Sequence, residues 1–189
     1  MTAPPERVWR VFPWDPNAPA GARFSPGFVP ATQGQGRFDL PRKPGGVRYA
    51  AETPEHAVAE MIQHFRGQRL AAADLRIGGH GLALVDLTLA PGLRERIVDL
   101  CDPAALVGLG LRPDTTASHD RKTTQRIAAD LHDARHPGLR WWSAFTGDWH
   151  MVVLFRDRLE RPPDSGPPQA LAIDHPAVMG AARALGISR

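Results

Sequence analysis

The chain is poor in cysteine and in long apolar runs, and each shortage excludes a class of protein. Cys101 is the only cysteine in 189 residues, so an intramolecular disulfide and a multi-cysteine metal site are excluded. No run of about 18 apolar residues occurs, and the first residues lack an apolar segment of signal-peptide length. We therefore expect a protein of a reducing compartment, the cytoplasm, without membrane contact.

Lysine is scarce as well. Lys43 and Lys122 are the only lysines among 23 basic residues, and the formal net charge is only +3 although the pI is 9.7. Dispersed charge of this kind does not form the basic face that nucleic-acid binding by charge requires. The planar arginine fork is suited instead to bidentate contacts with phosphate or carboxylate. We expect discrete anion contacts and no direct binding of nucleic acid.

Several cofactor and catalytic motifs are missing. Residues 34–36 (Gly-Gln-Gly) lack the third glycine and the preceding strand of a dinucleotide-binding fingerprint, and no P-loop or Gly-x-Ser-x-Gly pattern occurs. His132 and His136 have the i, i+4 spacing of a helical zinc site, but aspartate replaces the glutamate that would follow the first histidine, and Pro137 ends the helix. We predict no metal site and no tightly bound cofactor.

The apolar pattern predicts short, interspersed strands and helices. The length fits a single domain over residues 1–189, and 19 prolines with 18 glycines favour short elements. Strands are expected over residues 8–12, 47–51, 82–89, 139–145 and 150–155, and helices over residues 54–66, 118–132 and 176–185. An irregular excursion is expected over residues 13–33 and a linker over residues 160–169. The predicted fold class is α+β, a mixed α/β domain.

Three chemically different side chains lie close together between residues 34 and 60. Arg37 is in a loop, Tyr49 is in a predicted strand, and Glu60 is in the helix that follows. Thr53 is a good N-cap and Pro54 suits the first helical position, so the helix begins directly after the strand. A strand, a short turn and a helix in this order allow Tyr49 and Glu60 to face one cleft.

These side chains suit cleavage of a ribosyl N-glycosidic bond. Its oxocarbenium-like transition state favours a carboxylate near the ribose, an aromatic surface, and cationic clamps on attached phosphates. Glu60, Tyr49, Arg37 and Arg10 are groups of these types. Two alternatives stay open from the pattern alone. Glu60 lies roughly 130° from the centre of the apolar stripe of its helix, so it is also compatible with a solvated glutamate. Arg10 is also compatible with an edge-strand arginine that reaches solvent. Several anionic ligands remain compatible.

The same residues resemble the RES domain family, which is named for its arginine, glutamate and serine. Five short pieces match in order and in approximate spacing across residues 7–159. They are Trp9–Phe12, Gly36–Asp39, Val47–Ala50, Ala57–Glu60 and Gly138–Ser143, the last followed by Val152–Phe155 and Arg158–Leu159. Each piece is short, and their shared order makes the resemblance specific.

The resemblance implies a fold similar to that of the ADP-ribosyltransferase toxins and an enzyme that degrades NAD+. Family members are commonly bacterial toxins neutralised by an Xre-type helix-turn-helix antitoxin. Several phosphorolyse NAD+ to nicotinamide and ADP-ribose-1″-phosphate, so that NAD+ is the substrate and inorganic phosphate the co-substrate. Some transfer ADP-ribose to protein, and this stays an alternative function. A homo-oligomer is compatible with the resemblance.

The resemblance also assigns roles to individual residues. Arg10 and Arg37 would bind the dinucleotide, and Arg23, in the excursion between them, is an alternative to Arg10. Tyr49 would pack on the nicotinamide ribose. Glu60 would stabilise the oxocarbenium ion.

Ser143 would position the nicotinamide end of the substrate. Trp141 and Trp142 precede it where tyrosine or arginine is expected, so a hairpin serine without a catalytic role stays an alternative. The remaining alternative for the whole chain is a non-catalytic module that binds nucleic acid or a partner protein through its arginines.

Overall fold

The computed structural model of the chain describes residues 6–30, 33–41, 43, 45–143 and 148–188. The residues cluster into two compact units, each built from segments that are far apart in the sequence. The first unit comprises Met1–Phe28, Ala50–Leu89 and Pro163–Arg189, and the second comprises Val29–Tyr49 and Ala90–Pro162. The prediction of a single domain over residues 1–189 stays a prediction.

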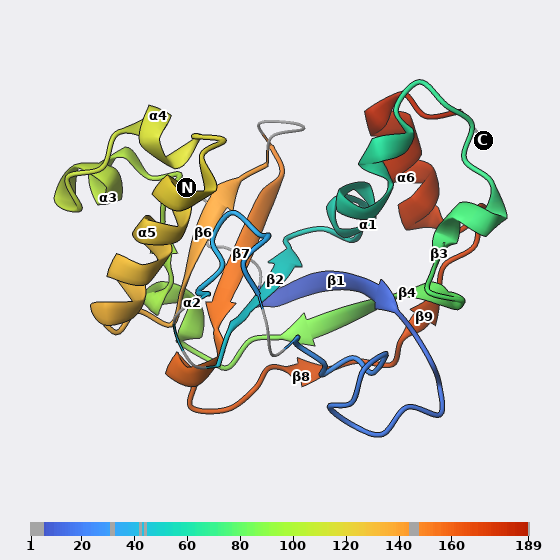
Figure 1. Ribbon diagram of the computed structural model, residues 1–189, viewed down its shortest axis with the longest axis horizontal. Helices are drawn as coiled ribbons and strands as arrows, with labels where there is room; N and C mark the ends of the chain where they lie inside the picture. The colour runs from blue at the N-terminus through green and yellow to red at the C-terminus, as the bar shows by residue number, and fades with distance from the viewer. Residues whose placement is uncertain (1–5, 31–32, 42, 44, 144–147, 189) are drawn as a thin grey trace. The chain divides into compact units, whose positions relative to one another are not determined.

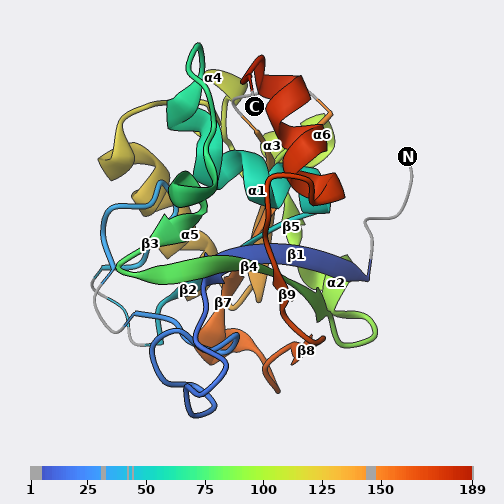
Figure 2. The ribbon, with the colours of Figure 1, turned by 90° about the vertical axis from the view of Figure 1, so that its right-hand side faces the viewer.

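The sheet of the first unit is built on β4 (His80–Thr88). Residues 82–85 of this strand are all buried apolar side chains, as is typical of a strand covered on both faces. β4 pairs antiparallel with β1 (Arg7–Pro13), from Arg7 opposite Thr88 to Pro13 opposite Leu82. The other strands of this unit are β3 (Arg76–Ile77), β8 (Asp164–Ser165) and β9 (Gln169–Ala170), which pair with β4. Of β2 (Val47–Ala51), only Ala50 and Ala51 belong to this unit, and Ala51 pairs with Trp9 of β1. The strand order within this unit is therefore β3-β4-β1, and Figure 2 shows β1 beside β4.

Two helices of the first unit pack against each other. α1 (Pro54–Ile62) begins at the predicted cap, where the Thr53 hydroxyl oxygen accepts a hydrogen bond from the His56 amide at 3.1 Å. α6 (Pro176–Leu185) lies beside α1 (Figure 1) and ends at Gly186, whose φ is +67°. A Cβ atom at Gly180 would lie 2.6 Å from Glu55 Cγ, so glycine allows the close approach of the two helices. Short 3-10 turns cover Gln63–Phe65 and Ala72–Leu75.

The second unit contains a hairpin with a parallel edge. β6 (Gly138–Trp142) pairs antiparallel with β7 (His150–Phe155), and β5 (Val98–Asp99) runs parallel to β6. Arg140 Nη1 donates to Asp99 Oδ2 at 3.0 Å across the β5–β6 pair. The strand order of this unit is β2-β7-β6-β5, and the sheet is mixed because it contains both parallel and antiparallel pairs.

The main helix of the second unit is α5 (Arg121–Asp133), which packs against β6. Its buried apolar stripe consists of Ile127, Ala128 and Leu131, and the Asp120 carboxylate caps its first turn by accepting from the Lys122 amide at 3.0 Å. The shorter helices of the unit are α2 (Leu93–Arg96), α3 (Pro103–Gly108), α4 (Pro113–Thr116) and a 3-10 turn at Arg156–Arg158.

The predicted mixed α/β fold is confirmed, and three details of the prediction are wrong. Residues 160–169 are not a plain linker, because β8 and the first residue of β9 form there by pairing with β4. The helix predicted over residues 54–66 is α-helical only to Ile62. The helix predicted from residue 118 begins at Arg121, because Asp120 is its cap. Residues 144–147, which include the end of the strand predicted over residues 139–145, lie outside the described residues.

Candidate functional site

A buried carboxylate organises the loop that carries Arg37. Asp39 is only 4% exposed, and its Oδ2 accepts hydrogen bonds from the amides of Gly34 and Gly36 at 2.7 Å each. Its Oδ1 accepts from the Tyr49 hydroxyl at 2.9 Å, and that hydroxyl accepts from the Phe38 amide at 3.0 Å. Position 36 requires glycine, because an added Cβ would lie 2.5 Å from both Asp39 Oδ1 and the Tyr49 hydroxyl. Loop and strand are thus joined by one network.

This network keeps the Tyr49 hydroxyl protonated. Burial is the largest cause that raises the pKa of Tyr49, and the negative charge of Asp39 and its hydrogen bond add to it. The hydroxyl donates to Asp39 and accepts from Phe38, so both of its hydrogen-bonding roles are filled within the unit. Its aromatic face, rather than its proton, is the part suited to contact a ligand.

Tyr49 is the only tyrosine of the chain, so its ionisation can be followed directly. We expect the near-ultraviolet absorbance of tyrosinate to appear near pH ~10 in the unfolded protein and only at higher pH in the folded protein. Above pH ~10 the unfolded state loses a proton that the folded state keeps, so the free energy of unfolding should fall by about 1.4 kcal/mol per pH unit. Tyr49→Phe should abolish this contribution. Equal midpoints for the folded and unfolded protein would contradict the hydrogen-bonded arrangement.

Arg37 is fixed by contacts on several sides. Its Nη2 donates to the carbonyl oxygens of Thr116 at 2.7 Å and Ser118 at 3.0 Å. Its Cζ lies 4.3 Å from the ring centroid of Trp141, a cation–π distance. The Thr124 hydroxyl on α5 donates to the Arg37 carbonyl. A guanidinium held in this way presents its positive charge without having to reorganise.

Ser143 lies in the same unit as Arg37 and Tyr49. It directly follows β6, is 4% exposed, and its amide donates to the Trp149 carbonyl at 2.6 Å, which continues the pairing with the strand opposite. Side chains two apart in a strand share a face, so Ser143 is on the face of Trp141, against which Arg37 stacks. The second unit therefore collects Arg37, Tyr49 and Ser143.

Glu60 belongs to α1 in the first unit. Its side chain is 31% exposed, and its Oε1 lies 3.0 Å from Nε2 of His56, one helical turn earlier. The His56 side chain is 0% exposed, so the histidine is a rigid support. Glu60 is accordingly neither buried nor freely solvated: one carboxylate oxygen is oriented by a fully buried imidazole.

The two other predicted arginines lie in the first unit. Arg10 on β1 donates from Nη1 to the carbonyl oxygens of Phe28 at 2.8 Å and Pro26 at 3.3 Å, and so fastens the excursion that follows β1. Arg23 is exposed, and its Cζ lies 4.8 Å from the Phe24 ring centroid. Phe24 has a φ of +71°, which is unusual for a residue with a side chain, and its ring stacks on His80 at 3.9 Å.

The structure thus sorts the six predicted residues into two sets. Arg37, Tyr49 and Ser143 belong to the second unit, and Arg10, Arg23 and Glu60 belong to the first. The sequence analysis did not identify His56, which orients Glu60, or Asp39, which binds the Arg37 loop and Tyr49. The i, i+4 spacing of His56 and Glu60 on one predicted helix is a signal that could have found the first. Asp39 ends the matched piece Gly36–Asp39, but its role as a support cannot be read from the sequence, because two of its partners are backbone amides.

Neither a metal site nor a membrane-spanning helix is found among the described residues. Within these residues, no group of three or more His, Cys, Asp or Glu side chains is placed to hold a metal ion. His132, one of the two histidines with zinc-like spacing, is 2% exposed, and its Nε2 lies 2.9 Å from Asp157 Oδ2. No helix in the same part of the chain is long and apolar enough to cross a membrane.

Comparisons with known proteins agree with the residue pattern. The sequence model of the RES domain family matches residues 7–174. The fold resembles a chain in the crystal structure of the M. tuberculosis MbcT–MbcA toxin–antitoxin complex, with a TM-score of 0.57 and 19% sequence identity over 87% of this chain and 83% of that chain. No curated protein matches the sequence.

Proposed function

The chain belongs to the RES domain family, and from this premise we propose that it cleaves the nicotinamide–ribose bond of NAD+. The proposed reaction is phosphorolysis, with inorganic phosphate as co-substrate and nicotinamide and ADP-ribose-1″-phosphate as products. The proposed biological role is that of a bacterial toxin in the cytoplasm, neutralised by a helix-turn-helix antitoxin of the Xre type. A resemblance in fold to a chain of a toxin–antitoxin complex supports this role.

The observation that carries the proposal is the environment of Glu60. A partly exposed carboxylate, with one oxygen 3.0 Å from a fully buried histidine, is oriented yet accessible to a ligand. Negative charge fixed in this way stabilises a cation that develops next to it, and an oxocarbenium ion is such a cation. A solvated helix glutamate would have no buried support.

The proposed step conserves atoms and electrons. The bond between ribose C1″ and the pyridinium nitrogen breaks, and its electron pair stays on the nitrogen, so that nicotinamide leaves as a neutral molecule. A phosphate oxygen then forms the new bond to C1″. Glu60 stabilises the positive charge on the ribose between these events, and it neither gains nor loses a proton.

The other site residues bind and orient the substrate in this proposal. Arg37, fixed by two carbonyls and stacked on Trp141, offers a stationary positive charge for the pyrophosphate. Tyr49 offers its aromatic face to the nicotinamide ribose, and Ser143 positions the nicotinamide end. Arg10 binds the dinucleotide, either directly or by holding in place the irregular segment after β1, to which it is hydrogen-bonded. Arg23 in that segment is the alternative contact.

The test is nicotinamide release from NAD+ by the purified protein, measured by chromatography with and without phosphate. Phosphorolysis requires that phosphate accelerate release and that mass spectrometry find ADP-ribose-1″-phosphate. Release that is independent of phosphate, with free ADP-ribose as product, would identify a glycohydrolase. Incorporation of label from NAD+ into a protein of a cell lysate would identify the alternative, a protein ADP-ribosyltransferase. Absence of nicotinamide release under all these conditions would overturn the proposal.

His56 is expected to act through Glu60 as a positioning residue. Losing the partner that orients a metal-binding side chain typically costs about 10–100-fold in activity. By analogy, His56→Ala should lower kcat by about this factor with little change in KM. His56→Gln keeps an amide nitrogen close to the position of Nε2 and should restore most of the rate. If both variants lose thermal stability equally but only His56→Ala loses kcat, positioning is separated from folding. Equal losses of kcat would contradict this role.

A further inference from the structure

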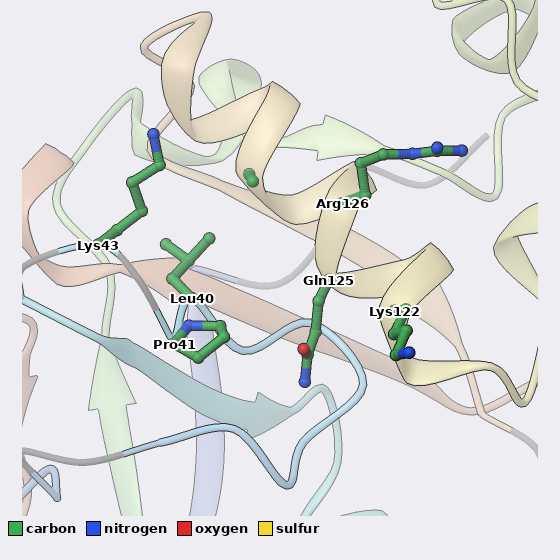
Figure 3. A pocket seen from close by; sticks show the side chains of 7 residues that line it. Leu40, Pro41, Lys43, Lys122, Gln125 and Arg126 are labelled. Carbon is green, nitrogen blue, oxygen red and sulfur yellow. The ribbon is translucent and has the colours of Figure 1, made fainter.

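A cavity of about 350 Å³ lies in the second unit, against α5. Its lining is Leu40, Pro41, Lys43, Lys122, Gln125, Arg126 and Ala129 (Figure 3). Leu40, which is 2% exposed, forms an apolar centre with Pro41 and Ala129. Both lysines of the chain line this one cavity, and among the described residues no acidic side chain lines it. None of the residues given roles in NAD+ cleavage is part of the lining.

The cations lie on two sides of the apolar centre. Figure 3 shows Lys43 on one side of Leu40 and Pro41, and Lys122 and Arg126 along α5 on the other. Lys43 Nζ is 2.6 Å from Asp133 Oδ1, so its charge is partly neutralised. The carboxylate of Asp120, which caps α5 and is not part of the lining, attracts the Lys122 ammonium group electrostatically. Arg126 and Lys122 are both exposed and carry most of the remaining positive potential.

This arrangement favours an extended ligand over a single small anion. One phosphate needs donors that converge on it, whereas here an apolar surface separates the cations. Single-stranded nucleic acid binds on aromatic platforms along a basic groove, and no aromatic side chain is among the described residues that line this cavity. A peptide segment with an apolar side chain flanked by carboxylates matches both features, since charged groups of opposite sign then meet at the rim.

We propose that this cavity is a docking site for an acidic segment of a partner protein. The apolar side chain of the segment packs on Leu40, Pro41 and Ala129. Its carboxylates pair with Lys122 and Arg126 on one side and with Lys43 on the other. The inference is independent of NAD+ cleavage, because it uses a different set of residues and is tested by binding.

Docking here acts on the loop that carries Arg37. Gln125, one of the lining residues, donates from Nε2 to the carbonyl oxygens of Gly34 at 3.0 Å and Gly36 at 2.9 Å. A segment bound in the cavity therefore contacts Gln125, whose side chain is hydrogen-bonded to both ends of the turn at residues 34–36. The partner gains a contact through which it can restrain or displace the loop.

The test uses a short synthetic peptide with two central leucines, glutamates on both sides and blocked ends. Binding to the full chain is measured by fluorescence anisotropy at two salt concentrations. We expect a dissociation constant on the order of 10–100 μM that weakens several-fold when salt is raised, because the paired charges are exposed. The double variant Lys122→Glu/Arg126→Glu should bind at least about tenfold more weakly, one decade of affinity.

The matched control is Arg69→Glu/Arg183→Glu, which changes the net charge equally at two exposed arginines of the first unit. It should bind the peptide like the parent, and thermal melting should confirm that both variants fold. Replacing the leucines of the peptide by serine should weaken binding if the apolar centre takes part. The proposal is overturned if the Lys122/Arg126 variant binds like the control, if the serine peptide binds equally well, or if single-stranded RNA of equal charge binds more tightly than the peptide.

Discussion

Glu60→Gln is expected to lower kcat for nicotinamide release by about 10²–10³-fold, the usual loss when one preorganised electrostatic contact to a transition state is removed. KM should stay within about threefold of the parent, because the carboxylate is proposed to act on positive charge that moves from the pyridinium ring to the ribose only in the transition state. The glutamine side chain has the same shape and can still meet His56, so the melting temperature should change little. Initial rates measured over a range of NAD+ concentrations separate kcat from KM.

Glu55→Gln is the matched control for this prediction. It makes the same chemical change on the same helix, five residues before Glu60, and lies in the first turn of α1. Its kcat should remain within about twofold of the parent, although loss of an acidic group at a helix N-terminus can cost about 0.3–1 kcal/mol of stability. If Glu60→Gln is as active as Glu55→Gln, the proposed role of Glu60 is wrong.

The elements that the sequence predicts well are those with signals at their own ends. α6 has the predicted bounds, Pro176 to Leu185, because Pro176 stands at its first position and Gly186 follows its last. α1 begins as predicted, because Thr53 accepts the expected hydrogen bond. In contrast, β8 and β9 are two residues each and exist only by pairing with β4. No local pattern specifies strands of this kind.

The same distinction applies to the candidate site. Residue types that suit an anionic ribosyl substrate can be read from the sequence, and the match of the RES domain family confirms the resemblance that connected them. Their supports could not all be read in this way. Arg37 is held by the carbonyl oxygens of Thr116 and Ser118, and backbone atoms carry no sequence signature. The spacing of the buried His56, one turn from Glu60, pointed to one support. Asp39 stands in the matched piece Gly36–Asp39, but nothing in that piece indicates what it binds.

Asp39→Ala is expected to have the largest effect on stability among the site variants, at about 3–5 kcal/mol. The substitution removes the acceptor of three hydrogen bonds, from the Gly34 and Gly36 amides and the Tyr49 hydroxyl. Hydrogen bonds to a charged group contribute about 1.5–3 kcal/mol each. The net loss is smaller than the sum of three such bonds, because the substitution also removes the cost of burying the carboxylate charge. Chemical denaturation monitored by circular dichroism measures the change in the free energy of unfolding.

Asp39 also connects loop geometry to activity. If the carboxylate holds the Arg37 loop against Tyr49, Asp39→Asn should retain part of the stability, because the amide oxygen of asparagine can still accept hydrogen bonds. The same substitution should raise KM for NAD+, because the loop loosens.

Tyr49→Phe removes one of the three donors. The double variant Asp39→Ala/Tyr49→Phe should therefore lose less stability than the sum of the single variants, with a coupling of about 0.5–3 kcal/mol. Additive losses would show that the two side chains act independently. The network would then hold the loop through the Gly34 and Gly36 amides alone, and Tyr49→Phe would leave KM unchanged.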